Sequence, residues 1–188
     1  METLRIAYDS REQKALHLLE GREISKGVIL EYEEVTLNTF DYAIYGDWED
    51  WEGHKTKRVN FAIERKSVGD FISSFCGPSA KNERAKIARA REEWGVRGEP
   101  IVYVIEGAYE EIKAYNYNVF PQGKINARVI LAKMRDLRWS GVHVILCPHR
   151  AAAEYEIISL LKKRARAVQF KNAMKEKAKD TDYANKLV

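Results

Sequence analysis

The segment 61–71 constrains the fold of this chain most, because it predicts a strand that passes directly into a helix. Side chains alternate between the two faces of a strand, so Glu64 and Lys66 share one face. Ser67 is a preferred helix N-cap residue, and the apolar residues that follow it at helical spacing are Val68, Phe71, Ile72 and Phe75. The segment therefore predicts a carboxylate and an amine at a strand-to-helix corner of an α/β domain.

A carboxylate and an ammonium group on one strand face suit the hydrolysis of phosphate esters. Glu64 can hold a divalent cation, and Lys66 beside it can orient or deprotonate a water molecule or offset charge in the transition state. The spacing Glu-x-Lys also arises by chance on exposed strand faces. The short motif by itself therefore leaves a structural role open.

The other strands of the amino-terminal half are predicted from short apolar runs bounded by turn residues. These runs are Leu4–Tyr8, Val28–Leu37, Asp41–Tyr45 and Arg58–Lys66. We expect the last three to form an antiparallel ribbon. Residues 46–57 have mixed charge and no periodicity, which predicts an exposed loop. Ser10 is expected to cap a helix whose apolar stripe is Ala15, Leu18 and Leu19.

The carboxyl-terminal half alternates helices with buried strands. Ile101–Ile105 and Val142–Leu146 are near-continuous apolar runs, typical of strands that are covered on both faces. Helices are predicted at about Asn82–Trp94, which is rich in Arg and Lys, at about Lys124–Trp139, and in a last segment that contains Ile157. This order indicates an α/β fold with a central mixed sheet flanked by helices.

Composition permits several functions and excludes others. A chain of 188 residues with 45% hydrophobic content can form one well-packed domain, and its net charge of +4 is mild, so binding to a polyanion would depend on clustered charge. The two cysteines lack metal-ligand spacing, which suits a reducing compartment. No apolar run reaches the length of a membrane span. We expect an intracellular protein of the cytoplasm or nucleoid, or of the nucleus in a eukaryote.

Two longer strings relate the chain to a known family. E-R-K-x-x-x-D begins at Glu64, and D-S-R-E begins at Asp9. The first string resembles the signature of the XPF family of structure-specific DNA endonucleases, and the strand around it is most similar to the Mus-type branch. The resemblance extends from about Ile6 to Arg166. It implies a restriction-endonuclease-like core of the PD-(D/E)xK type, which we assign to residues 1–168, with a basic helical or flexible tail at 169–188.

The same resemblance implies five catalytic residues, which are Asp9, Asp41, Glu64, Lys66 and Asp70. Asp41 lies in Phe-Asp-Tyr-Ala-Ile, which matches the family's Gly-Asp-Tyr-x-Ile except for Phe40. Asp47 follows a true glycine and is the alternative. Two of the five also suit structural roles, because acids are favoured at helix starts, as at Asp9, and Ser67-x-x-Asp70 is the spacing of a capping box.

The implied reaction is divalent-metal-dependent hydrolysis of branched or flapped DNA that leaves 5′-phosphate and 3′-hydroxyl ends. Mg²⁺ would be held by Asp41, Glu64 and Asp9, and Mn²⁺ would substitute because it shares the preference for oxygen ligands. The residues assigned to DNA contact are Arg11, Arg65, Arg84 and Lys163. Glu12 is placed at the site without a defined role. For Arg65, strand geometry favours packing or an ion pair as much as phosphate contact.

Two other functions stay open: a non-catalytic DNA-binding scaffold subunit of the same fold, and a nuclease of Holliday-junction or restriction type. Family nuclease domains pair through their last helices, so a homodimer, or a heterodimer with a related subunit, is expected. A helicase partner is also expected, because the sequence has no helicase motif. Typical members add helix-hairpin-helix modules, and no Gly-rich hairpin pairs follow Arg166 in the printed sequence.

Overall fold

The structure is a computed structural model that describes residues 2–12, 21, 23–25, 27–37, 39–49, 55–77, 79–93, 101–119 and 123–185. The strands are β1 (Glu2–Asp9), β2 (Glu23–Ser25), β3 (Val28–Val35), β4 (Tyr42–Glu49), β5 (Lys55–Ser67), β6 (Ile101–Glu106), β7 (Asn116–Val119), β8 (Gly123–Asn126) and β9 (Val142–Cys147). The helices are α1 (Val68–Cys76), α2 (Ala80–Glu93), α3 (Tyr109–Ala114), α4 (Ala127–Trp139) and α5 (Arg150–Asn185).

Seven strands form one mixed sheet in the order β2-β3-β1-β4-β5-β6-β9. The pairs β1–β3, β5–β6 and β6–β9 are parallel, whereas β2–β3, β1–β4 and β4–β5 are antiparallel. Strands β7 and β8 form a separate antiparallel pair. The predicted α/β fold with a central mixed sheet flanked by helices is confirmed.

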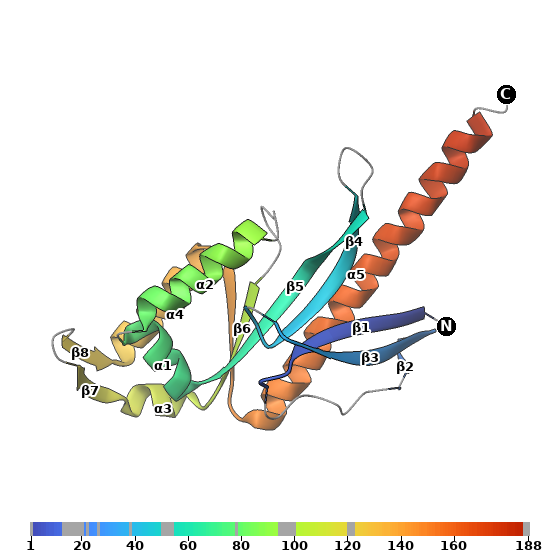
Figure 1. Cartoon of the computed structure of the whole chain (residues 1–188). Helices are drawn as coiled ribbons and strands as arrows, with labels where there is room; N and C mark the ends of the chain where they lie inside the picture. Colours follow the sequence, from blue (N-terminus) through green and yellow to red (C-terminus); the bar gives the residue numbers. More distant parts are fainter. Residues whose placement is uncertain are drawn as a thin grey trace.

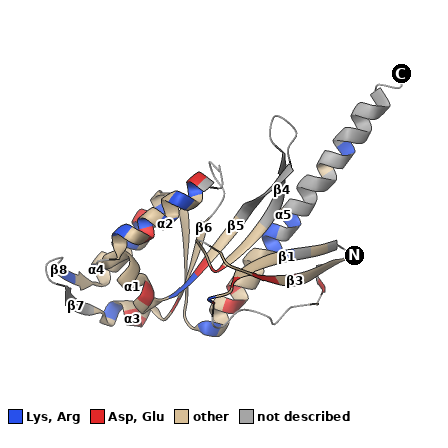
Figure 2. Cartoon of the chain, in the orientation of Figure 1, with Lys and Arg blue, Asp and Glu red and all other residues tan. Residues whose placement is uncertain are grey.

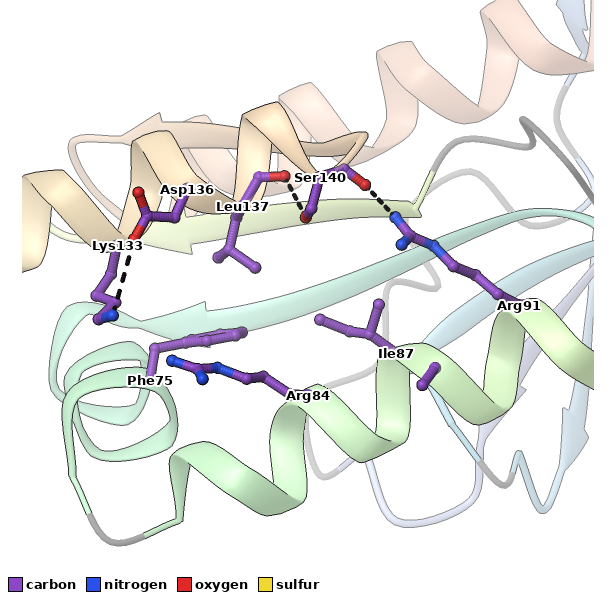
Figure 3. Close-up of a pocket in the computed structure, with 9 residues that line it drawn as sticks. Phe75, Arg84, Ile87, Arg91, Lys133, Asp136, Leu137 and Ser140 are labelled. Carbon is purple, nitrogen blue, oxygen red and sulfur yellow. Dashed lines mark hydrogen bonds and ion pairs between the residues drawn. The ribbon is translucent and has the colours of Figure 1, made fainter.

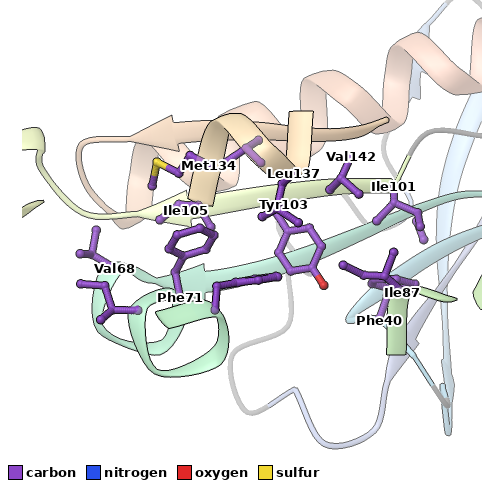
Figure 4. Close-up of a cluster of buried hydrophobic side chains, with 14 of the residues drawn as sticks. Phe40, Val68, Phe71, Ile87, Ile101, Tyr103, Ile105, Met134, Leu137 and Val142 are labelled. Atoms are coloured by element: carbon purple, nitrogen blue, oxygen red, sulfur yellow. The ribbon is translucent and has the colours of Figure 1, made fainter. Parts of the chain in front are cut away.

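Each face of the sheet has its own hydrophobic core. Helices α1, α2 and α4 cover one face, where Phe71, Tyr103, Ile87 and Met134 pack together (Figures 1 and 4). Helix α5 covers the other face through Ala153, Ile157 and Leu161. The predicted stripe of α1 is confirmed, since Val68, Phe71, Ile72 and Phe75 are all buried. The first five residues of β6 are likewise buried, as expected for a strand with helices on both sides.

The predicted antiparallel ribbon of three strands is wrong at one junction. β4 and β5 do pair antiparallel, but β1 lies between β3 and β4 and pairs with both. β1 can occupy this central place because both of its faces are apolar: Ile6 and Ala7 are adjacent, point to opposite faces and are both buried. Local apolar patterns do not reveal which distant strand becomes a neighbour.

Two other boundaries also differ from the prediction. Residues 46–49 and 55–57 belong to β4 and β5, with Glu49 opposite Lys55, so these parts of the expected loop are paired strands. Backbone hydrogen bonds hold such a pair without apolar periodicity. Helix α4 begins at Ala127, because the Asn126 side chain accepts a hydrogen bond from the N–H of Val129. The residues before it form β8.

Three further expectations concern the helices. The helix expected after Ser10 falls mostly on residues 13–20, which lie outside the described part of the chain. Helix α5 runs without interruption through the expected domain boundary at residue 168, and that boundary stays a prediction. Among the described residues, no helix combines the length and apolar character needed to cross a membrane.

Candidate active site

Three carboxylates come together in a row across neighbouring strands. Tyr8 of β1 pairs with Tyr42 of β4, which pairs with Ile63 of β5, so the residues next to them, Asp9, Asp41 and Glu64, lie side by side. The backbone N–H of Asp9 donates to the carbonyl of Asp41 at 2.9 Å, and that of Asp41 donates to the carbonyl of Ile63 at 3.1 Å. The row lies on the sheet face that carries α1, α2 and α4.

Asp41 is held by the main chain of β5 and by no cation of its own among the described residues. Its Oδ2 accepts a hydrogen bond from the backbone N–H of Arg65 at 2.7 Å. Burial, followed by the negative charge of Glu64, raises the pKa of Asp41 to about 7. The surrounding protein therefore compensates the negative charge of an ionised Asp41 incompletely.

Glu64 is 4% exposed and ion-paired with two lysines. Its Oε1 lies 2.9 Å from Nζ of Lys66, which follows on the same strand face, and its Oε2 lies 2.8 Å from Nζ of Lys86, which comes from α2. A carboxylate this buried would be costly without such partners. Glu64 and Lys66 are thus in contact, as predicted, and Lys86 is a third charged residue beside them.

Lys66 is shared between two acids. Its Nζ is 3.6 Å from Oε1 of Glu83, and the hydroxyl of Tyr103 donates to the same Glu83 oxygen at 2.7 Å. Burial by itself would lower the pKa of Lys66, but the charge of Glu64 and the hydrogen bond to it outweigh this effect, and the pKa is raised. Lys66 is therefore a fixed ammonium group rather than a proton acceptor at neutral pH.

Asp9 is neutralised locally by Arg11. Nε of Arg11 is 2.9 Å from Oδ1 of Asp9, and a guanidinium NH2 is 2.6 Å from Oδ2, so both carboxylate oxygens are taken. The hydrogen bond from the Arg11 side chain is the main reason that the pKa of Asp9 is lowered. The structure brings Asp9 into the row, but with its oxygens directed to an arginine.

Arg65 lies on the opposite strand face from Lys66, as the alternation predicts. Its guanidinium bridges Glu12 at 2.8 Å and Glu106 at 2.9 Å, and the Arg65 side chain is 16% exposed. This bridge fastens the segment after β1 to the ends of β5 and β6. The contacts of Arg65 and Glu12 are therefore those of an internal ion-pair network.

The remaining predicted residues lie outside the row. Asp70 is exposed, its N–H donates to Ser67 Oγ at 3.0 Å, and its carboxylate accepts from that hydroxyl at 2.7 Å, which is the contact set of a helix start. Lys163 lies on α5 beside Phe61, across the sheet from Glu64. Asp47 pairs with Lys57 about 20 Å along β4 from Asp41. The structure thus places Asp41, and not Asp47, next to Glu64.

Sequence reasoning did not place Glu83 and Lys86 of α2 beside the row of carboxylates. Glu83 and Lys86 are three residues apart and lie on one face of the helix, which is a visible signal. That this face meets Glu64 and Lys66 depends on how α2 crosses the sheet, and the sequence pattern does not show it. Tyr103 was predicted only as part of a buried strand, and its hydroxyl holds Glu83 in place.

The row opens into a cavity of about 560 Å³ lined by Asp9, Arg11, Glu12, Thr39, Phe40, Asp41, Arg65 and Lys86. Within the described ranges, no three His, Cys, Asp or Glu side chains are arranged to hold a metal ion. The contacts explain this arrangement, because Arg11 covers Asp9 and lysines cover both oxygens of Glu64. Asp41 and Glu64 fit Mg²⁺ by donor chemistry, and the Lys86 ammonium stands in for a cation beside them.

A second, basic groove lies between α2 and α4. Lys and Arg gather along α2 (Figure 2), and Figure 3 shows Arg84, Arg91 and Lys133 around a floor that includes Phe75 and Ile87. The groove has a volume of about 510 Å³. Arg91 donates to the carbonyl of Ser140, and Lys133 lies 3.7 Å from Asp136. The structure therefore puts Arg84 in this groove and not in the acidic cavity.

Comparisons with known proteins agree with this architecture. The family model described as the ERCC4 domain matches residues 8–159. The solved structure of XPF from Aeropyrum pernix superposes with a TM-score of 0.54 at 18% identity, covering 90% of this chain and 69% of that one. The structure of the same protein in complex with DNA gives 0.51 at 17% identity, covering 87% and 66%. No curated protein sequence gives a significant match.

Proposed function

The chain belongs to the ERCC4 domain family, and from this we propose that it is a divalent-metal-dependent endonuclease that cuts branched or flapped DNA. The XPF-type resemblance of its sequence is confirmed by the family match and by the shared fold. The observation that carries the proposal is the half-buried Asp41 next to the buried Glu64, with Lys66 beside Glu64, at the edge of an open cavity.

Mg²⁺ is the cofactor that these residues would hold, through Asp41 and Glu64. A bound Mg²⁺ would polarise the scissile phosphate and the attacking water, and Mn²⁺ would substitute for it. Asp9 would join as a ligand only where Arg11 releases its oxygens, so we assign Asp9 and Arg11 to the rim of the site. The negative charge of Asp41, which has no ion-pair partner of its own among the described residues, supports a divalent cation at this place.

Lys66 supplies the fixed positive charge of the site. Its raised pKa keeps it protonated at neutral pH, so it would orient water and offset the charge that develops on the phosphoryl oxygens. Glu83 holds the ammonium from the other side at 3.6 Å and limits its movement. Positioning by Lys66, rather than proton abstraction, is the role that these contacts support.

Helix α2 offers a route for the DNA backbone past the site. It directs Lys86 to the acidic cavity and Arg84 and Arg91 to the basic groove, so cations line both sides of one helix. Phosphate contacts of this kind bind DNA without sequence preference and weaken with salt. Arg11, which is exposed at the cavity rim, extends the same route. Lys163 would contact DNA only on the far face.

Several finer features follow from the family and stay proposals for this chain. The products would carry 5′-phosphate and 3′-hydroxyl ends, and the substrates would arise in DNA repair and recombination inside the cell. The active form would be a homodimer or a heterodimer with a related subunit. A helicase partner would supply unwinding.

The deciding experiment incubates labelled flap, fork, four-way junction and linear duplex DNA with the full chain, in Mg²⁺ and in EDTA. Wild type is compared with Glu64→Gln and Lys66→Ala, and with Lys81→Ala as a control, because Lys81 is an exposed lysine of α2 outside both cavities. Metal-dependent cutting of branched DNA that only the two site variants lose supports the proposal. Metal-independent binding without cutting would indicate a scaffold subunit, and a preference for linear duplex would indicate a restriction-type nuclease.

A further inference from the structure

Resting on the proposed metal site, we propose that Lys86 is a positioning residue that holds Glu64 in the metal-free protein and competes with the divalent cation for it. Nζ of Lys86 lies 2.8 Å from Oε2 of Glu64, and the Lys86 side chain is 23% exposed. It also lines the cavity that contains Asp41. The Lys86 ammonium group therefore occupies an oxygen that a metal at this pair would need.

Lys66 and Lys86, the two lysines paired with Glu64, differ in how firmly other contacts hold them. Lys66 follows Glu64 on the same strand and is also held by Glu83, so it stays when the other oxygen changes partner. Lys86 reaches over from α2, and Glu64 is its only ion-pair partner among the described residues. Its Nζ also lies 5.2 Å from the centre of the ring of Phe40, which lines the same cavity. Lys86 is thus the displaceable cation.

Charge balance favours exchange of Lys86 for a divalent ion. Lys66 and Lys86 together supply two positive charges to the carboxylates of Asp41, Glu64 and Glu83, whereas Mg²⁺ in the place of Lys86 would raise the total to three. Once displaced from Glu64, the Lys86 ammonium group remains in the cavity that the scissile phosphate would enter, where it can form a charge-assisted hydrogen bond with a phosphate oxygen. Binding of metal and of phosphate should therefore strengthen each other through Lys86, and DNA-free protein should bind metal weakly.

The test measures Mn²⁺ binding to the full chain without DNA, by calorimetry at fixed pH and salt. Lys86→Met removes the charge but keeps a long, unbranched apolar side chain, and we expect it to tighten Mn²⁺ binding by about tenfold, within the usual range of coupling between sites. Lys81→Met makes the same change on the exposed side of α2 and should stay within about twofold of wild type. A merely structural role for Lys86 would weaken metal binding on mutation, so the direction of the change distinguishes the two roles.

Two further variants keep the outcome decisive. Lys86→Gln also removes the charge and replaces Lys86→Met if circular dichroism shows that the latter does not fold. Lys86→Arg keeps the charge and should bind Mn²⁺ no more tightly than wild type. Equal or weaker binding by the neutral variants overturns the role of Lys86 and leaves the metal site intact. Absence of Mn²⁺ binding in every variant, including wild type, overturns the metal site and with it the proposed function.

Discussion

The Oδ2 atom of Asp41 accepts a hydrogen bond of 2.7 Å from the backbone N–H of Arg65. This bond joins the residue that precedes β4 to β5, one position beyond Glu64. The carboxylate is therefore placed by main-chain atoms, which change little with solvent conditions, while its ionisation responds to burial and to Glu64. Replacing Asp41 by the isosteric Asn should keep the hydrogen bond to Arg65 and remove only the negative charge.

Asp41→Asn should stabilise the metal-free protein at high pH. The folded-state pKa of Asp41, about 7, is above its ordinary value of 3.8, so between these values the folded protein keeps a proton that the unfolded chain has lost. The contribution of Asp41 to the unfolding free energy therefore falls as pH rises from about 4 to 7. At pH 8 the variant should be more stable by on the order of 2 kcal/mol, since its amide oxygen still accepts from Arg65.

The measurement is urea unfolding in EDTA at several pH values, with Glu92→Gln as the control because Glu92 is an exposed acid of α2. The advantage of Asp41→Asn should vanish near pH 4. If the variant is still more stable than wild type at pH 4, or less stable at pH 8, the ionisation of Asp41 is not what destabilises the folded protein.

Arg65→Met should destabilise the fold strongly, because it removes the ion pairs of 2.8 Å with Glu12 and 2.9 Å with Glu106. Breaking a buried ion pair costs about 3 kcal/mol or more. Arg5→Met, which removes an exposed pair with Glu31 at 3.7 Å, is the matched control and should cost less than about 1 kcal/mol. Chemical denaturation of both variants measures the difference, and equal losses would show that Arg65 is not an internal bridge.

Asp70→Asn should affect the start of α1 and leave metal binding unchanged. Ser67→Ala removes both hydrogen bonds between the two residues and should cost about 1 kcal/mol, whereas Asp70→Asn keeps an acceptor oxygen, loses only the negative charge at the helix start and should cost about 0.5 kcal/mol. The double variant should cost less than the sum of the two losses, because both substitutions act on the same pair of contacts. Mn²⁺ affinity of Asp70→Asn within about twofold of wild type is expected, and a tenfold loss would instead place Asp70 in the metal site.

Gly107→Ala should test the packing of the strand-to-helix corner. Gly107 has a φ of +149°, and an added Cβ would lie 2.5 Å from Cγ2 of Val68 at the start of α1. We expect a loss of about 2–3 kcal/mol from strain and overpacking. Gly69→Ala, within α1, has no such contact and should stabilise by up to about 1 kcal/mol. Thermal unfolding of the two variants should therefore shift in opposite directions.

The sequence predicted correctly those helices and strands that depend on residues close together in the chain. The cap at Ser67 and the apolar stripe after it were sufficient for α1, and the apolar runs were sufficient for β6 and β9. The adjacency of Glu64 and Lys66 followed from strand alternation alone. Each of these features is decided within a few residues, so the sequence carries the information directly.

The remainder of the site depends on pairings between distant segments. Nothing in residues 2–9 indicates that β1 enters between β3 and β4, and this insertion brings Asp9 next to Asp41. The contact of Lys86 with Glu64 depends on the crossing of α2 over the sheet, which is set by packing of Ile87 and Ala90 in the core. The motif resemblance identified Asp41 as a candidate site residue, and the structure adds the groups that surround it.

The central place of β1 links the assembly of the site to the kinetics of folding. β1 is hydrogen-bonded on both sides, to β3 and to β4, so the sheet is complete only after two long loops have closed around it. Closing such non-local contacts is slow compared with helix formation. Helices α1 and α2 can therefore form early, but Asp9 and Asp41 become neighbours only at the last cooperative step. The cavity rim formed by Asp9 and Arg11 should consequently be completed only in the slowest phase of refolding, after Asp41 and Glu64 have come together through the β4–β5 pair.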